Sequence, residues 1–274
     1  MKKALILFLF LPAMLLADST FVSPSFYFTY GDYSNKNLSK SFAFYNTSEI
    51  TKNAFLTIHY DNLSISAKDW SYLQQTFLAN SYVNLFPFGM KGTYAQFKGD
   101  YSYKPNKFIY NDYTNLYSAD LFYYNNLYYF GLSYTYLSVN GILNIKGLTH
   151  QKSSQLTLRL EKILSNDLFL SVKPNYSQLT DGRKLLSVSG KVHYLLSSQL
   201  LLKAGGMIGK RAYYFDSDLL TIYNQDDTQK SLYFGQIEYS FNNSLKLITA
   251  FQRTNFQSYA INYFVVGLKS NFFF

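Results

Sequence analysis

Apolar and polar side chains alternate with a period of two in one segment of this chain after another. In residues 155–161, leucines at the even positions oppose Thr157, Arg159 and Glu161 at the odd positions. Neighbouring side chains of a β-strand point to opposite faces, so each such run predicts a strand with one oily face. The runs last about ten residues, which is the length of a tilted strand that crosses a bilayer.

Short polar turns and longer polar stretches separate these runs. The short turns are residues 125–126, 165–167, 197–198 and 242–243. The longer stretches are residues 31–36, 104–114, 140–152, 180–183 and 212–229. Short turns on one rim and long loops on the other are typical of bacterial outer-membrane barrels, in which the short turns are periplasmic.

The pattern predicts an all-β fold, a transmembrane antiparallel β-barrel of fourteen strands with both termini on the periplasmic side. The expected strands are residues 20–30, 37–49, 54–68, 73–86, 91–104, 115–125, 127–139, 152–164, 167–179, 184–196, 199–212, 230–241, 244–257 and 260–274. The apolar phase shifts at Asp61-Asn62, which we interpret as a bulge within one strand. A hairpin turn there would change the count, so twelve or sixteen strands remain alternatives.

The N-terminus has the pattern of a secretory signal peptide. Met1-Lys2-Lys3 precede an apolar run from Ala4 to Leu16, and the small residue Ala17 follows. The run is too short to cross a bilayer as a helix. We therefore expect residues 1–17 to be a cleaved signal peptide and residues 18–274 to form a barrel in the bacterial outer membrane.

Composition and charge fit this reading. The chain has 28 Tyr and 25 Phe but no Cys, and its formal net charge is +9. Aromatic residues favour a pleated sheet, and a sheet closed on itself needs no disulfides to hide its edges. The basic excess, which persists without Lys2 and Lys3, suits partners such as lipopolysaccharide or an anionic polysaccharide. Alternatively, the lysines simply flank the membrane band. No nucleic-acid partner is expected.

Strand parity directs a set of basic side chains into the lumen as candidate binding residues. They are Lys98, Arg159, Lys173, Lys191, His193, Lys203, Lys246 and Lys269. The carboxylates expected on the same face are Asp100, Asp120, Glu161 and Glu238. A cationic lumen favours anions, including acidic sugar polymers. The alternative is that the cations pair with these carboxylates and fill the interior.

The C-terminal strand carries a specific signal. Apolar residues at alternate positions end in an aromatic residue, with Ser270 as the one polar break. The set comprises Phe264, Val266, Leu268, Phe272 and Phe274. It resembles the terminal-strand signature by which the barrel assembly machinery is understood to recognise outer-membrane proteins. The alternative is an ordinary edge strand that ends in Phe.

Candidate catalytic groups are sparse. His150 and Ser153 resemble the His and Ser of outer-membrane phospholipases, but an odd spacing puts them on opposite strand faces. Ser154 lies about 13 Å along the chain from His150. The acidic residues of the longest loop, Asp216, Asp218, Asp226 and Asp227, lack the histidine or glycine pattern of a protease or calcium site. A surface loop and a solvated acidic loop are therefore expected, with no catalytic residue, metal or cofactor. Gly205, Gly206 and Gly209 are expected to relieve crowding in the barrel wall.

Two segments suggest a family. The start Phe26-Tyr27-Phe28-Thr29-Tyr30-Gly31-Asp32-Tyr33-Ser34, with Asn37-Leu38 after it, resembles the YaiO family of outer-membrane β-barrels, as does Gly131-Leu132-Ser133-Tyr134-Thr135-Tyr136. The resemblance covers most of the mature chain in strand length and spacing, although residues 212–229 form a longer loop than that family leads us to expect. It implies an envelope protein linked to export or handling of exopolysaccharide, without catalytic residues to carry over.

The favoured function is a non-enzymatic outer-membrane barrel, either a narrow porin or a channel associated with exopolysaccharide or another envelope polymer. One alternative is a structural or adhesive barrel that binds a partner through extracellular loops such as residues 108–113. A lipid-active, phospholipase-like barrel enzyme is the other alternative.

Overall fold

The computed structural model describes residues 21–105, 108–144 and 147–274. The predicted signal peptide, residues 1–17, lies outside the described residues. The strands are β1 (Phe21–Tyr33), β2 (Leu38–Thr51), β3 (Ala54–Ser66), β4 (Trp70–Leu85), β5 (Phe88–Tyr103), β6 (Phe108–Tyr124), β7 (Tyr128–Asn144), β8 (Gly147–Ser165), β9 (Leu168–Leu179), β10 (Lys184–Ser197), β11 (Leu200–Arg211), β12 (Tyr214–Asp216), β13 (Thr221–Tyr223), β14 (Gln229–Ser240), β15 (Leu245–Phe256), β16 (Ala260–Ser270) and β17 (Phe272–Phe273). In the described part of the chain, no helix is long and apolar enough to cross a membrane.

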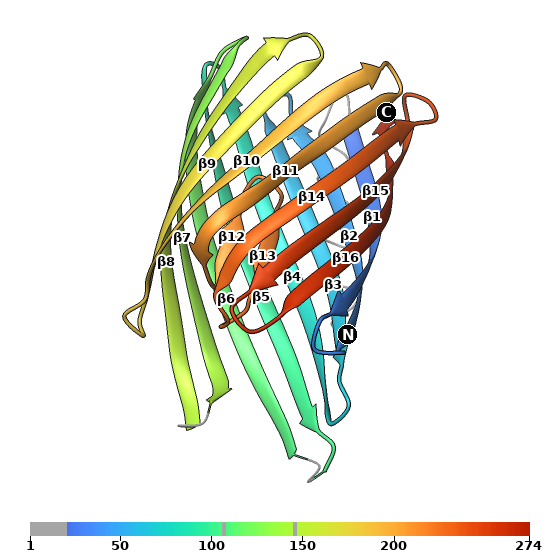
Figure 1. The fold of residues 1–274 in the computed structure, drawn as a ribbon. Coiled ribbons are helices and arrows are strands. Elements are labelled where there is room, and N and C mark those ends of the chain that lie inside the picture. The colour runs from blue at the N-terminus through green and yellow to red at the C-terminus, as the bar shows by residue number, and fades with distance from the viewer. Residues whose placement is uncertain (1–20, 106–107, 145–146) are drawn as a thin grey trace.

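Fourteen strands form a closed antiparallel barrel, as the sequence predicts (Figure 1). Each wall strand pairs with the next, and β16 pairs with β1 to close the ring. The short β17 pairs with the start of β1, beyond the end of β16. The strands β12 and β13 pair only with each other and form a separate two-stranded sheet.

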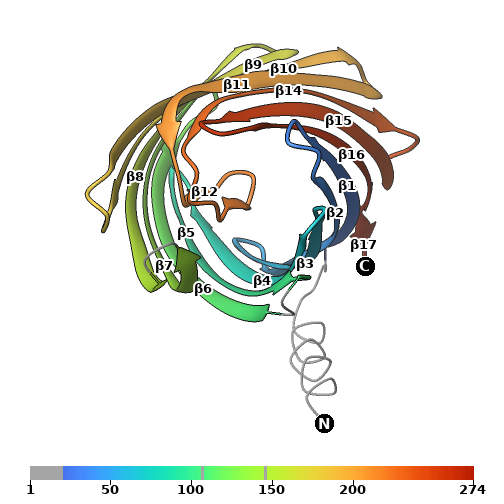
Figure 2. The same ribbon diagram turned by 60° about the horizontal axis from the view of Figure 1, so that its bottom comes forward.

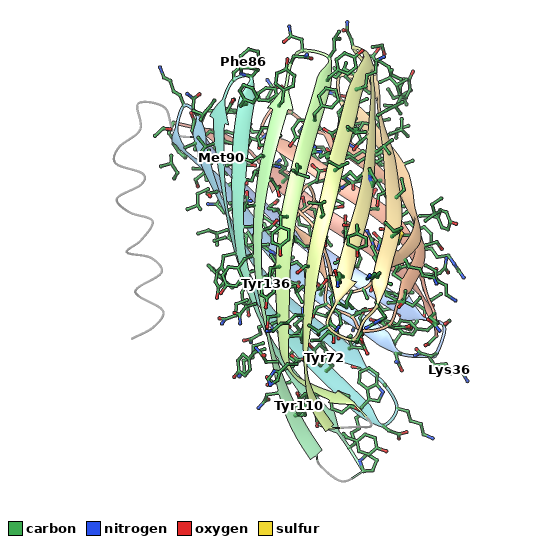
Figure 3. The ribbon with its side chains drawn as sticks, turned by 90° about the vertical axis from the view of Figure 1, so that its left-hand side faces the viewer. Lys36, Tyr72, Phe86, Met90, Tyr110 and Tyr136 are labelled. Atoms are coloured by element: carbon green, nitrogen blue, oxygen red, sulfur yellow. The ribbon has the colours of Figure 1, made fainter. Side chains whose placement is uncertain are left out.

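The two-residue rhythm of the sequence separates an outer from an inner face. On β8, Leu156, Leu158 and Leu160 are exposed on the outside, whereas Thr157 and Glu161 are buried inside. Large apolar side chains stay exposed in the same way on strands around the barrel (Figure 3). Because a water-soluble protein does not leave such a continuous apolar belt in contact with solvent, lipid is the medium that suits this face.

The two rims differ, but less in loop length than predicted, because the connections at residues 67–69 and 257–259 on the expected long-loop rim have only three residues each. One carries short connections such as the turn at Phe86, and the other carries the loop at Lys36; these two residues lie at opposite ends of the barrel in Figure 3. We call these ends the turn rim and the loop rim. The hairpins β5–β6 and β7–β8 extend farthest at the loop rim (Figure 1). The prediction of irregular loops at residues 104–114 and 140–152 is wrong in part, because β6 begins at Phe108 and β8 begins at Gly147.

The predicted bulge at Asp61-Asn62 is also wrong. The pairing of β3 with β2 and with β4 continues through both residues without a shift of register. The apolar phase changes because Leu63 and Ile65 belong to the inner face. Near the loop rim, Ile65 packs against a small interior cluster of Tyr33, Phe256 and Ile261.

Candidate functional site in the barrel lumen

The segment between β11 and β14 folds into the barrel. Its two strands, β12 and β13, pair from Tyr214 with Tyr223 to Asp216 with Thr221. Figure 2, which looks into the barrel, shows β12 inside the ring of wall strands. We call residues 212–228 the lumen hairpin. The expectation of a solvated acidic loop here is wrong for Asp216, which is buried together with Tyr213, Tyr214 and Phe215, whereas Asp226 is exposed.

A break in the wall starts the lumen hairpin. The register of β11 against β14 shifts between Ile208 and Arg211. Gly209 has a φ of +110°, and a Cβ at this position would collide with the carbonyl oxygen of Leu186. Only glycine suits this position. Gly209, predicted to relieve crowding in the barrel wall, also turns the chain from β11 into the lumen. The Arg211 guanidinium then lies over the Tyr214 and Tyr223 rings, 4.2 and 4.5 Å from their centroids.

One side of the lumen hairpin is apolar. Tyr213 and Phe215 belong to a buried cluster with inward side chains of the barrel wall, and Leu220 and Ile222 pack against that cluster. The wall residues of the cluster are Leu78, Ala95, Phe97, Leu116, Leu137, Val139, Leu179 and Leu185. The interior thus has a hydrophobic core. The alternation of apolar and polar residues does not predict it, because part of the inner face is also apolar.

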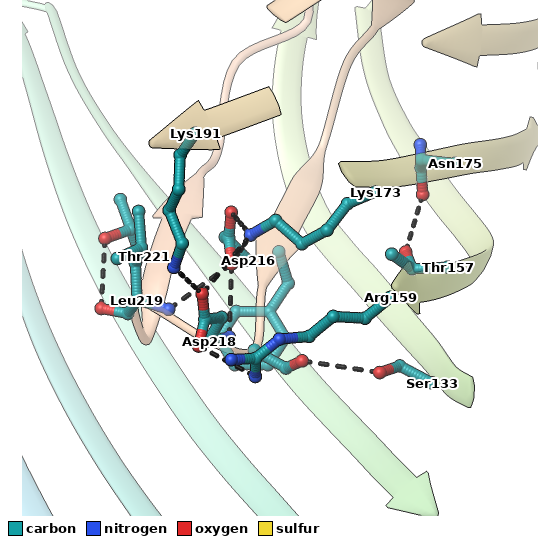
Figure 4. A network of polar contacts seen from close by, with 12 residues as sticks. Ser133, Thr157, Arg159, Lys173, Asn175, Lys191, Asp216, Asp218, Leu219 and Thr221 are labelled. Carbon is teal, nitrogen blue, oxygen red and sulfur yellow. Dashed lines mark hydrogen bonds and ion pairs between the residues drawn. The ribbon is translucent and has the colours of Figure 1, made fainter. Parts of the chain in front are cut away.

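The tip of the lumen hairpin is acidic and meets three cations of the wall (Figure 4). Asp218 forms ion pairs with Arg159 of β8 at 2.8 Å, with Lys191 of β10, and with Lys173 of β9 at 3.7 Å. Asp216 pairs with Lys173 at 2.6 Å. Arg159 also contacts Glu161 at 2.7 Å. Three cations therefore face three carboxylates in a buried network, which is the arrangement that charges need inside a protein.

This network sets the protonation of the hairpin carboxyls, which lie outside the membrane-spanning strands. Burial alone raises a carboxyl pKa. At Asp218 the nearby charges of Arg159, Lys191 and Lys173 outweigh burial, and they hold its pKa well below the usual range. Lys173 lowers the pKa of Asp216 in the same way. Both side chains are therefore ionised at neutral pH.

Neutral contacts tie the lumen hairpin to further positions on the wall. Gln155 of β8 donates to the carbonyl oxygen of Phe215 at 2.8 Å and accepts from its N–H at 3.0 Å. The Ser133 and Ser217 hydroxyls lie 3.4 Å apart. On the far side, the Tyr259 hydroxyl donates to Gln225 at 2.8 Å. The hairpin is thus held from β7, β8 and the loop that joins β15 to β16.

Seven of the eight predicted cations lie on the inner face. Arg159, Lys173 and Lys191 hold the hairpin. The other four lie nearer the turn rim, where Lys203 pairs with Glu238 and where His193, Lys246 and Lys269 also point inward.

The predicted inward orientation of Lys98 is wrong. Its side chain is 48% exposed, on the same face of β5 as Tyr94. Asp100, whose carboxylate lies 4.0 Å from the Lys98 amine, shares this outer face. The parity of β5 is inverted because Ala95 and Phe97 turn inward into the apolar cluster around the hairpin.

Sequence reasoning noted Asp216 and Asp218 as loop residues but missed that they bind cations of the lumen wall. The available signal was indirect: three inward cations on consecutive strands needed countercharges, and Glu161 is the only carboxylate on those three strands. The longest acidic loop was the remaining source of carboxylates.

The phospholipase-like pair is not brought together. His150 is exposed and contacts Asn140 at 2.8 Å, whereas Ser153 is buried on the inner face of the same strand. His150 lies within β8, so its placement in a surface loop is also corrected.

The C-terminal signature faces outward. Phe264, Val266, Leu268, Phe272 and Phe274 are all exposed. Their recognition by the assembly machinery remains a prediction.

Comparison with known proteins supports the fold. The CymD monoaromatic hydrocarbon channel superposes with a TM-score of 0.63 at 7% identity, covering 96% of this chain and 91% of that one. The toluene transporter TodX of P. putida gives a TM-score of 0.57 at 8% identity, covering 93% and 90%. The toluene transporter TbuX of Ralstonia pickettii gives 0.52 at 8% identity, covering 94% and 90%. The chain has the fold of outer-membrane β-barrels. At such identities, the likeness establishes the fold alone.

No family model and no curated protein sequence matches the chain. Membership of the YaiO family therefore stays a prediction.

Proposed function

We propose that this protein is a non-enzymatic channel of the bacterial outer membrane, a narrow porin whose lumen is constricted by residues 212–228. The apolar outer belt supports a barrel surrounded by lipid. In the smallest barrels, of about eight strands, the wall side chains fill the interior. A barrel of fourteen strands is wider and encloses more space than its wall side chains fill. The lumen hairpin occupies part of this space, so it controls what remains for a solute.

The observation that carries the proposal is the charged middle of the lumen. Arg159, Lys173 and Lys191 come from three neighbouring wall strands and meet the tip of the hairpin. Ionised groups stay inside a barrel only where water or countercharges solvate them. The interior therefore suits small hydrophilic solutes better than the hydrocarbons named for the CymD and TodX channels.

Solute passage through proteoliposomes tests the proposal. Arg211 and Gln229 face each other across β11 and β14, so an Asn-Gly turn can replace residues 212–228 and close a tight hairpin. The wild-type protein should admit only small sugars and give a low conductance in planar bilayers. The shortened variant should admit larger sugars and conduct more.

A second shortened hairpin is the control. Tyr101 and Tyr110 face each other on β5 and β6, so Asn-Gly in place of residues 102–109 trims the loop rim without altering the lumen. Its permeability should match that of the wild type. If neither the wild type nor the variant without the lumen hairpin passes any solute, the channel proposal is overturned in favour of a structural or adhesive barrel.

A further inference from the structure

A second group of cations lies inside the barrel between the lumen hairpin and the turn rim. Lys246 is the second residue of β15, and Lys269 is the last but one of β16. They stand directly opposite each other in the register of these two strands. Both point to the inner face, as does Lys203 near the start of β11.

Lys246 and Lys269 are not neutralised as the hairpin cations are. At the hairpin, three cations meet three carboxylates. Near the turn rim, Glu238 pairs with Lys203. Among the described residues, no ion pair forms at Lys246 or Lys269. Like charges directly opposite on neighbouring strands destabilise a sheet, and inward charges require water or a counterion. The chain therefore keeps a local excess of positive charge at a cost to its own stability.

We infer that Lys246 and Lys269, with Lys203 beside them, form a binding site for a polyvalent anion that carries several carboxylates or phosphates. The site faces the lumen rather than the lipid, so a dissolved solute reaches it from the turn rim. Two ammonium groups on adjacent strands can contact two anionic oxygens of one solute at the same time. The inference deepens the proposed channel function and rests on it for physiological meaning, but binding itself requires no passage through the barrel.

Direct binding tests the inference with the mature protein in neutral detergent at low salt. Titration calorimetry uses tripolyphosphate and citrate as probes. The variant K246Q/K269Q should bind both probes at least about tenfold more weakly, because it loses the charged contacts to the anion. Heat-modifiable migration on gels verifies that the barrel has folded.

A matched variant separates a site from a general field. K210Q/K230Q removes the same two charges from exposed positions, so it changes the net charge equally. It should bind both probes within about twofold of the wild type. The inference is overturned if K246Q/K269Q binds as the wild type does, if both variants weaken equally, or if the wild type binds neither probe.

The outcomes distinguish this inference from the channel proposal. A protein that binds tripolyphosphate at Lys246 and Lys269 but passes no solute, even without the lumen hairpin, retains the site and is not a channel. A protein that conducts without binding either probe is a channel without this site.

Discussion

Asp218 contacts cations from three neighbouring strands, Arg159 at 2.8 Å, Lys173 at 3.7 Å and Lys191. Removing one partner of a buried ion pair leaves an uncompensated charge and costs about 3–5 kcal/mol. We therefore expect Asp218→Asn to loosen the lumen hairpin and raise the single-channel conductance in planar bilayers. The neutral contacts of Gln155 should keep part of the population closed, so the current should fluctuate between two levels.

Asp32 provides the control for this substitution. It is exposed at the loop rim, and Asp32→Asn removes the same charge far from the hairpin tip. Its conductance should equal that of the wild type. A single, unchanged conductance level in Asp218→Asn would show that the ion pairs do not hold the hairpin.

The pKa values of Asp216 and Asp218 predict how the constriction responds to pH. In a released hairpin both carboxyls have an ordinary pKa of about 3.9, whereas in the closed state both values are lower. Closure is therefore fully stabilised above this pH and is lost as the pH falls through the lower values. Conductance should stay constant from about pH 8 to pH 5 and rise only below about pH 4. A transition between pH 5 and pH 7 would instead contradict control of the constriction by these two carboxyls.

At the scale of elements, the wall strands and the lumen hairpin were unequally predictable. The period-two pattern locates β9 and β10 to within one residue at each end, since lipid on one side and a polar interior on the other dictate each side chain. Residues 212–228 have no such period because they contact several strands at once. Their inward fold depends on Gly209 and on cations more than twenty positions away in sequence, and a local pattern cannot express such contacts.

The hairpin can be locked to the wall to test whether it moves. The chain has no cysteine, and the Ser133 and Ser217 hydroxyl oxygens lie 3.4 Å apart. The variant S133C/S217C should form a disulfide on oxidation after a small adjustment, because the two sulfurs must come to about 2.0 Å. Added to Asp218→Asn, the oxidised lock should restore the low conductance, and reduction should raise it again.

The single variants S133C and S217C in the Asp218→Asn background are the controls, and oxidation should leave their conductance unchanged. If the oxidised double variant still conducts at the higher level, the hairpin does not move away from β7 when conductance rises. In that case the constriction would have to lie elsewhere in the lumen.

At the scale of the whole molecule, the inside and the outside of the barrel follow different rules. The outside faces lipid all the way round, so the outward side chains of every wall strand are mostly apolar. The number of strands can therefore be predicted from the sequence. The inside meets the chain's own hairpin, which presents aromatic residues to one part of the wall and carboxylates to another. The inward Phe97 and the outward Lys98 reflect this mixture, and they explain why one strand's parity was predicted in reverse.

The outer belt yields a prediction about stability in lipid. Leu158 is 47% exposed on the outer face of β8, well inside the strand and far from either rim. A Lys on the lipid face near the bilayer midplane costs about 2–4 kcal/mol, but only about 0–1 kcal/mol near the interface. Leu158→Lys should therefore lower the free energy of unfolding from liposomes by the larger amount in urea titrations. Leu38→Lys, on the same face at the loop rim, should cost little. Because both variants exchange one exposed leucine for one lysine, a difference between them reports depth in the membrane, and equal costs would mean that the apolar belt does not face lipid.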